Sequence, residues 1–357
     1  MFFSGESGEF FSMSKTNRII KTRVFVSLFV TLLPFSVQAQ ECERSCLEGF
    51  VDQYLDALID NNPAAVALSN DVRFTENGQR LNLRDGLWQT MQAKGDYRIF
   101  VTDVPAQQVT FLGTIFEEHR DPAQMTPALL SLRLRIENNQ ISEIEHFVVR
   151  STSAAERLIE SKPRPEFTTA LTESQRMPRN EMLEIANMYF TGMQKNDGLM
   201  DYPFADDCDR IENGMQSTNR PTPEGETRPD PSDASSYSAQ WSCLEQFQSG
   251  LIFFVNRIRD RRFVAVDEER GLVFAFVFFD HSGGDFRHGV TPNGRNVTAG
   301  PVQPWTWGIA EIFKVYDGSI HEIEAILERV PYGMNSGWST WEQGMSDELQ
   351  DVTFSED

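Results

Sequence analysis

Two glutamates in matching short segments are the first candidates for acid–base chemistry. Glu76 and Glu212 are each followed by Asn-Gly, and an arginine, Arg73 or Arg210, stands a few residues before each. A carboxylate held in an apolar pocket has a raised pKa, so it can remove a proton near neutral pH. The alternative is an ion pair with the neighbouring arginine at the rim of a pocket, and Asn-Gly is also a common turn sequence.

Two tyrosines and a histidine are further candidates. Tyr54 and Tyr189 fall on the apolar faces of predicted helices, where a tyrosine most often packs in the core with its hydroxyl bonded to one partner. His281 follows Asp280 at the end of an apolar stretch, and an imidazole there can donate or accept a proton near pH 7. The alternative is a histidine at the edge of a loop.

Four arginines gather between positions 257 and 262 of this acidic chain. In a strand, alternate side chains share one face, so Arg257, Arg259 and Arg261 would point together toward a carboxylated substrate. The alternative is a solvated face that balances nearby acids. We take Arg259 and Arg261, with Arg210 and Asn213, as the candidate substrate-binding residues.

The elements that must hold these residues occur twice. Apolar residues recur at helical spacing in two segments, at Leu47, Phe50, Val51, Tyr54, Leu55 and Leu58, and at Met182, Ile185, Ala186, Tyr189, Phe190 and Met193. The two tyrosines are 135 residues apart, whereas Glu145 and Glu324 are 179 apart, so the second copy carries 44 additional residues. We expect units at 40–150 and 179–330, a linker at 151–178, insertions at 216–240 and 281–303, and an aromatic then acidic tail at 331–357.

Each copy opens with a helix and ends in strands. Residues 263–266 and 272–279 are rich in Phe and Val and flank a polar turn, which predicts two paired strands. Helices followed by a curved antiparallel sheet define an α+β fold. The aromatic segment 331–341 is too apolar for a free end, so we expect it to fold back on the second copy.

The order of these elements resembles the nuclear transport factor 2-like fold, whose enzymes include ketosteroid isomerase, scytalone dehydratase and the SnoaL-like polyketide cyclases. The resemblance rests on the helix with an internal tyrosine, on the segment Phe204-Ala205-Asp206-Asp207 and on the terminal strands, and it covers both copies. It implies two cone-shaped units, helices on a curved antiparallel sheet, packed as an internal pseudo-dimer. A further homo-oligomer stays open.

The same resemblance implies roles for the candidate residues. The step from the F-A-D-D segment to the family's catalytic base lands on Glu212, and the same step from Leu68 lands on Glu76. Tyr54 and Tyr189 match the tyrosine that stabilises the oxyanion. The family's second oxyanion donor falls near Ala310 or Glu311, and the first copy has Ser131 and Leu132 there, so we expect the second unit to hold the better site.

The resemblance therefore implies a cofactor-free lyase, dehydratase or isomerase acting on a small oxygenated molecule, aromatic ones included. Glu212, Tyr189 and His281, with Glu76 and Tyr54 in the first copy, would be catalytic. The alternative is a non-catalytic small-ligand-binding or scaffold protein of the same fold. No glycine-rich phosphate loop, nucleophile elbow or zinc-ligand spacing occurs in the sequence, so we expect no cofactor and no metal.

The N-terminus and the cysteines point to export. A basic segment, a short apolar run at 24–33 and the small-residue site Val37-Gln38-Ala39 predict a signal peptide at 1–39 and a secreted or periplasmic protein. Four cysteines then allow three disulfide pairings, of which we favour the local pairs. These pairs are Cys42 with Cys46 and Cys208 with Cys243.

The charge of the chain excludes some partners. The 53 acidic and 32 basic residues give a net charge of −21. Nucleic-acid binding needs clustered basic residues, and anionic membranes repel an acidic surface. We expect a small-molecule ligand, no nucleic acid, and no membrane after removal of the signal peptide.

Overall fold

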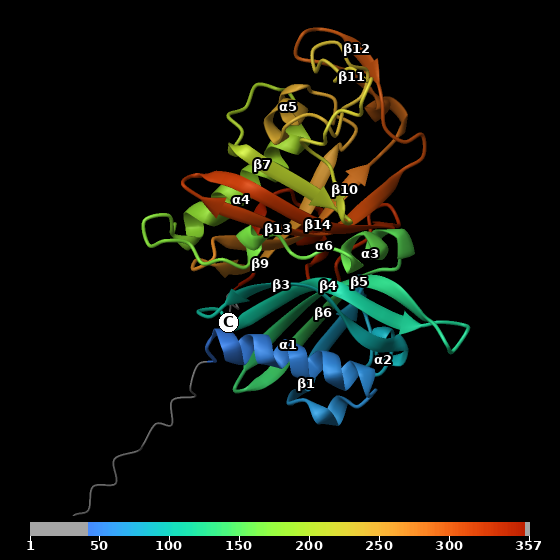
Figure 1. Cartoon of the computed structure of the whole chain (residues 1–357), viewed down its shortest axis with the longest axis vertical. Coiled ribbons are helices and arrows are strands. Elements are labelled where there is room, and N and C mark those ends of the chain that lie inside the picture. Colours follow the sequence, from blue (N-terminus) through green and yellow to red (C-terminus); the bar gives the residue numbers. More distant parts are fainter. Residues whose placement is uncertain (1–41, 354–357) are drawn as a thin grey trace, which may run out of the picture. The chain divides into compact units, whose positions relative to one another are not determined.

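Two curved sheets with their helices organise residues 42–353, which are the residues that the computed structural model describes (Figure 1). The predicted signal peptide, 1–39, lies outside these residues. Each half of the chain contributes one sheet and one long helix, so the predicted α+β class with two units is confirmed. The sheets are mixed rather than purely antiparallel, because the first long strand of each unit runs parallel to the last.

The first unit holds a six-stranded sheet. Its strands, in order across the sheet, are β2 (Gln79–Arg80), β1 (Leu68–Glu76), β6 (Gln140–Val149), β5 (Met125–Glu137), β4 (Gln108–Glu118) and β3 (Met91–Asp103).

The second unit repeats this order and adds a strand from the C-terminus. Its seven strands are β15 (Leu349–Asp351), β9 (Arg257–Asp267), β10 (Leu272–His281), β13 (Trp305–Tyr316), β14 (Ser319–Val330), β7 (Phe204–Glu212) and β8 (Met215–Gln216). The predicted strand pair around the turn at 267–271 is confirmed as β9 and β10. A separate hairpin of β11 (His288–Val290) and β12 (Asn296–Thr298) lies between β10 and β13.

Two long helices, α1 (Arg44–Ile59) and α4 (Arg179–Lys195), open the units where the helical spacing predicts them. Their apolar faces are buried against the sheets, and Tyr54 and Tyr189 lie within these buried faces. The remaining helices are α2 (Leu87–Thr90), α3 (Thr152–Ile159), α5 (Cys243–Gln248) and α6 (Trp341–Met345), with 3-10 turns at Pro63–Ala65, Pro165–Phe167 and Gly284–Arg287.

The Asn-Gly pairs that follow the two glutamates are two-residue hairpin turns. Asn77 and Asn213, and the glycine after each, have positive φ angles, as a type I′ turn requires. The turns join β1 to β2 and β7 to β8. The turn interpretation of Asn-Gly is therefore confirmed, and the turns place Glu76 and Glu212 at the ends of β1 and β7.

The faces of the two sheets that are turned away from the long helices share one apolar layer. Its members include Ile99, Leu112 and Leu129 from the first sheet and Phe274, Phe276 and Ile312 from the second. An ion pair crosses this layer, because Arg262 of β9 donates two hydrogen bonds, of 2.6 and 3.1 Å, to the Glu145 carboxylate of β6. The layer therefore joins the two units through apolar packing and buried charge.

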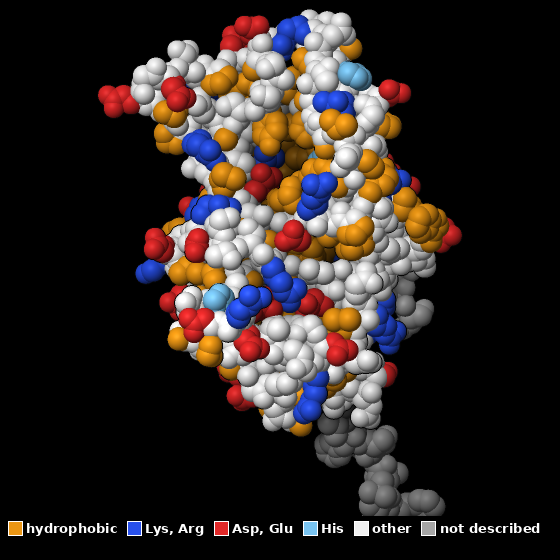
Figure 2. Space-filling view, turned by 90° about the vertical axis from the view of Figure 1, so that its right-hand side faces the viewer, with side chains coloured by type: hydrophobic (Ala, Val, Ile, Leu, Met, Phe, Trp, Pro, Cys, Tyr) orange, Lys and Arg blue, Asp and Glu red, His pale blue; other side chains and the backbone are white. Residues whose placement is uncertain are grey.

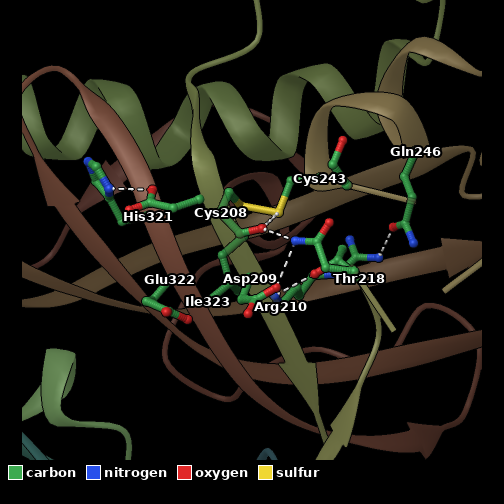
Figure 3. Close-up of a disulfide and its surroundings, with 12 residues drawn as sticks. Cys208, Asp209, Arg210, Thr218, Cys243, Gln246, His321, Glu322 and Ile323 are labelled. Carbon is green, nitrogen blue, oxygen red and sulfur yellow. Dashed lines mark hydrogen bonds and ion pairs between the residues drawn. A yellow bond between two sulfur atoms is a disulfide. The ribbon is translucent and has the colours of Figure 1, made fainter. Parts of the chain in front are cut away.

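Both predicted disulfides are confirmed. Cys42 pairs with Cys46 at the start of α1, and Cys208 pairs with Cys243, which ties β7 to α5 (Figure 3). Disulfides are typical of proteins that fold in an oxidising compartment. A secreted or periplasmic location stays a prediction.

The C-terminal tail folds back on the second unit as expected, and it also contacts the first. Arg259 of β9 donates to the carbonyl oxygens of Met334 and Gly344, at 2.9 Å each. Trp338 donates from its indole nitrogen to the hydroxyl of Thr75 on β1, at 2.9 Å. The tail thus connects the two units.

None of the helices within residues 42–353 has the length and apolarity needed to cross a membrane.

Candidate active site in the second unit

Two glutamates of the second unit lie in one row across the sheet, on the face that α4 covers. In the strand register, Glu311 of β13 stands between Ala275 of β10 and Ala325 of β14, and Ala325 in turn stands beside Glu212 of β7. Both alanines belong to the core that contains Tyr189. Because alanine carries only a methyl group, the neighbours of Glu311 in the row are small.

A buried arginine joins this row to the helix. Arg210 of β7 is 4% exposed, and its guanidinium donates hydrogen bonds of 3.1 Å to the Tyr189 hydroxyl and 2.6 Å to the Gln246 side chain of α5. The Cys208–Cys243 disulfide holds α5 beside β7, which brings Gln246 to Arg210 (Figure 3). The Tyr189 hydroxyl accepts a bond from Arg210 and also hydrogen-bonds with the Glu311 carboxyl group.

Burial makes Glu311 an acid that keeps its proton near neutral pH. Loss of solvent and the nearby charge of Glu212 raise the pKa of Glu311 to about 8, although Arg210 and a hydrogen bond with Tyr189 partly oppose this. Burial also raises the pKa of Tyr189 well above its ordinary value. The site therefore presents two neutral O–H groups in a region of low dielectric, as an oxyanion site does.

Glu212 lies nearer to solvent than Glu311. Its side chain is 31% exposed, and one carboxylate oxygen is 3.7 Å from Nε of Arg210. The predicted pairing of Arg210 with Glu212 is thus present, but Arg210 is buried in the core rather than placed at an outer rim. Its guanidinium lies between the Tyr189 hydroxyl and the Glu212 carboxylate.

Aromatic rings form a continuous wall in the same unit. Tyr237 lies 6.5 Å from Phe254, Phe254 lies 6.0 Å from His281, and the His281 ring stacks on Trp305 at 4.1 Å, measured between ring centroids. Burial and the charge of Glu212 raise the pKa of Tyr237, which stands at one end of this series of rings. In Figure 2, hydrophobic side chains surround a hollow in the upper part of the molecule, which the second unit forms.

His281 is held as a neutral ring. Burial lowers the pKa of His281 to about 4, and its Nδ1 lies 3.1 Å from the carbonyl oxygen of Phe279. A neutral imidazole with that nitrogen protonated can accept a proton at Nε2. These features do not favour the predicted donation of a proton to a leaving group at neutral pH.

In the first unit, larger side chains occupy the corresponding row of the sheet. Its row contains Leu132 and His146 where the second unit has Glu311 and Ala325. His146 receives contacts from both sides, 2.9 Å from Nε2 to the Tyr54 hydroxyl and 3.5 Å from Nδ1 to Glu76.

The first-unit glutamate is also ionised rather than poised to take a proton. Hydrogen bonding and the charge of His146, the Leu87 amide and Arg150 overcome burial and lower the pKa of Glu76 to about 2. Leu87 N–H donates to Glu76 at 2.7 Å and Arg150 donates at 3.1 Å. The raised pKa expected for a pocket carboxylate is therefore not found at Glu76.

Asn213 has a structural contact that the sequence did not reveal. Its side chain accepts from the Leu327 amide and donates to the Leu327 carbonyl, at 2.9 Å each, as a strand residue would. Asn77 makes the same pair of bonds with Val148 in the first unit. This repeated contact fixes β7 against β14 and favours a positioning role for Asn213 rather than substrate contact.

Arg259 and Arg261 point to opposite faces of the sheet, which corrects the expectation of a shared face. Asp260 has a φ angle of 52°, and the register of β9 against β10 shifts here, so a β-bulge reverses the alternation. Arg259 is fully buried and bonds Asp280, at 2.8 Å, whereas Arg261 bonds Thr191 of α4, at 2.9 Å. These contacts favour structural roles for both arginines.

Sequence reasoning missed Gln246 and the two alanines of the row. Two features of the sequence could have indicated them. The helix cap at Ser242 predicts a short helix after the insertion. The alternation in β10 and β14 places alanines on the inward face. Within residues 42–353, no three histidine, cysteine or acidic side chains gather as metal ligands would.

A long helix on a curved mixed sheet occurs twice, which is the arrangement expected for a tandem protein of the nuclear transport factor 2-like fold. The chain belongs to the family described as "Domain of unknown function (DUF8021)", whose model matches residues 40–148 and 175–327. No curated protein matches the chain.

Solved structures resemble parts of the chain in fold. They include AclR from Streptomyces galilaeus (11% identity, 32% of this chain and 85% of that one, TM-score 0.26) and an NTF2-like protein of unknown function from Burkholderia pseudomallei (18%, 32% and 98%, TM-score 0.23). Another is a hypothetical protein with a ketosteroid isomerase-like fold from Catenulispora acidiphila (11%, 31% and 92%, TM-score 0.23). At these identities and TM-scores they carry no argument about activity.

Proposed function

We propose that the second unit is a cofactor-independent lyase or isomerase that moves a proton on a small oxygenated molecule. The observation that carries the proposal is the row of Glu311, Ala325 and Glu212 beneath the Tyr189 hydroxyl. Together with Tyr189, the row supplies two neutral O–H donors and one more exposed carboxylate. The aromatic wall supports an aromatic or otherwise apolar body for the ligand.

Each group has a role in this reaction. The Glu212 carboxylate removes a proton from carbon next to a carbonyl group, and the electron pair moves onto the carbonyl oxygen. Tyr189 and protonated Glu311 donate hydrogen bonds to this oxyanion, and Arg210 lies beside it with a positive charge. In an isomerisation Glu212 returns the proton to another carbon. In a dehydration Glu212 gives the proton to a neighbouring hydroxyl group, which leaves as water while the electron pair of the oxyanion returns to form the carbon–carbon double bond.

A second candidate function is a non-catalytic small-ligand carrier of the same fold. The contact that favours it is the ion pair of Arg210 with Glu212, because this pairing occupies the carboxylate that would have to meet the substrate. Such a carrier would use Tyr189 and Glu311 only to bind an oxygen atom of the ligand.

The experiment is a screen of small carbonyl compounds in heavy water, in which NMR detects exchange of hydrogen for deuterium next to the carbonyl group. The proposal predicts that Glu212→Gln slows this exchange at least about 100-fold and leaves ligand binding in place. Asp206→Asn is the control, because it removes the same charge from an exposed position of the same strand. Equal exchange in wild type and Glu212→Gln would reject the catalytic role and leave the carrier function.

A further inference from the structure

A second cleft, distinct from the proposed active site, lies between the first sheet and the C-terminal tail. Its volume is about 460 Å³, within the usual range for small-molecule sites. Four arginines line it, Arg73 of β1, Arg133 and Arg135 of β5 and Arg262 of β9, together with Trp338 of the tail. Such a convergence of guanidinium groups is unexpected in a chain with a net charge of −21.

Two of the arginines are already neutralised by buried acids. Arg262 donates twice to Glu145, and Arg133 donates to Glu145 at 3.2 Å and to Glu143 at 2.7 Å. Arg135 lies 3.5 Å from Glu143 and donates to the carbonyl oxygens of Val352 and Thr353, at 3.2 and 3.3 Å. The carboxylates of Glu143 and Glu145 therefore already have arginine partners in the inner part of the cleft.

The other acids that line the cleft do not neutralise it. Asp351 accepts hydrogen bonds from the amide and hydroxyl of Thr353, and Glu137 is half exposed with its carboxylate 4.0 Å from Arg135. Asp351 and Glu137 therefore leave part of the positive charge of the arginines in the cleft without a close counter-charge.

Arg73 is the arginine of the cleft whose guanidinium can still pair with an anion. Among residues 42–353, no carboxylate lies within 4.0 Å of its guanidinium, and its buried Nε has no hydrogen-bond partner there. Its guanidinium lies 4.0 Å from the centre of the Trp338 ring and donates to the carbonyl oxygen of Gly337. Burial, with the charges of Arg80 and Arg133, lowers the pKa of Arg73, although the charges of Glu143 and Glu145 partly oppose this, so an additional anion would stabilise this arrangement.

We propose that this cleft binds a small anion through a carboxylate or phosphate group, held by Arg73 and Arg135 beside Trp338. The forked donors of arginine match both groups, since each accepts two parallel hydrogen bonds. Trp338 forms an aromatic side of the site and reports on its occupancy. The proposal does not depend on the chemistry of the second unit.

The test is calorimetric titration of the whole chain with citrate and, separately, with inorganic phosphate at constant ionic strength. Saturable binding of either probe is expected, and the probe that binds more tightly identifies the group. Arg73→Gln is expected to weaken binding roughly tenfold or more, about 1.4 kcal/mol. Arg120→Gln, which removes an exposed arginine of the first unit, is expected to bind as wild type does. The absence of saturable binding, or equal binding by Arg73→Gln, would overturn the proposal.

A second readout covers the case in which Arg73→Gln disturbs the tail. Wild-type tryptophan fluorescence is expected to change on binding of citrate or phosphate, and Trp338→Phe is expected to lose that change. Arg73→Lys keeps the charge without the forked geometry, so its affinity should fall between those of wild type and Arg73→Gln. A fluorescence change that persists in Trp338→Phe would place the anion elsewhere and reject the site.

Discussion

At the scale of single residues, the second unit differs from the first by the contents of one row of the sheet. Glu311 and Ala325 replace Leu132 and His146, so one unit has a protonated acid beside a small residue and the other has a histidine bonded to Tyr54. The family resemblance pointed to Glu212 and Tyr189, and to Ala310 or Glu311 for the second donor. Spacing in the sequence could not predict that Arg210 is buried, because two residues on one strand face indicate only that their side chains lie side by side.

Glu311→Gln tests the protonated state directly. Wild-type Glu311 has a raised pKa in the folded chain, so the folded state binds more protons than the unfolded state above pH 4.5, and stability falls as pH rises toward 8. Glu311→Gln removes this dependence while keeping the shape of the side chain. Between pH 5 and pH 8, wild type should lose on the order of 3 kcal/mol more unfolding free energy than Glu311→Gln, measured by urea denaturation.

Glu324 makes this comparison necessary, because burial also raises its pKa, to about 7. Its contribution is present in both proteins and cancels in the difference. Parallel pH profiles for wild type and Glu311→Gln would show that Glu311 is ionised at neutral pH.

At the scale of elements, the repeat made most of the fold predictable. Helical spacing located α1 and α4, and Asn-Gly located the turns after β1 and β7. The bulge at Asp260 was not predictable from the sequence. Asp260 has a positive φ angle although it is not a glycine, and distant contacts stabilise this conformation. One of them is the hydrogen bond from the Asp260 amide to the Ser346 carbonyl oxygen. One such residue reverses the faces of Arg259 and Arg261.

The disulfide between β7 and α5 has a predicted role in the site. Replacing Cys208 and Cys243 by serine opens a loop with a sequence separation of 35, which should cost on the order of 4 kcal/mol of unfolding free energy. The same change at Cys42 and Cys46, separated by four residues, should cost only about 2 kcal/mol. Denaturation midpoints under non-reducing conditions measure both.

Ligand binding distinguishes the roles of the two disulfides further. Release of α5 removes Gln246 from Arg210, so the Cys208/Cys243 variant should bind second-unit ligands less tightly, whereas the Cys42/Cys46 variant should not. Equal losses in both variants would indicate that α5 does not hold Arg210 in place.

At the scale of the whole molecule, the two units depend on each other. The apolar layer between the sheets, the Arg262–Glu145 pair and the tail connect them, so we expect a single unfolding transition for both. The repeat predicted a pseudo-dimer, but the sequence did not reveal which charged residues cross between the sheets. Arg262 and Glu145 are 117 positions apart, so no local pattern in the sequence indicates that they pair.

Arg262→Met tests this connection. It leaves the buried Glu145 carboxylate with fewer partners, so unfolding free energy should fall by about 3–5 kcal/mol in calorimetry. Adding Glu145→Met should recover part of the loss, because the second change removes a buried carboxylate that has lost one of its two arginine partners. Two separate transitions in wild type, or no recovery in the double variant, would contradict the expected coupling of the units.

The central claim, an oxyanion site in the second unit, is tested most directly by binding of 2-naphthol, whose fluorescence distinguishes the neutral from the ionised hydroxyl group. Tyr189→Phe and Tyr54→Phe each remove one buried hydrogen bond at equivalent positions of the repeat, so they are matched controls. The account predicts that wild type binds the ionised form and that Tyr189→Phe weakens binding by roughly tenfold, while Tyr54→Phe binds as wild type does. Equal binding by Tyr189→Phe and wild type, or equal weakening by both variants, would contradict it.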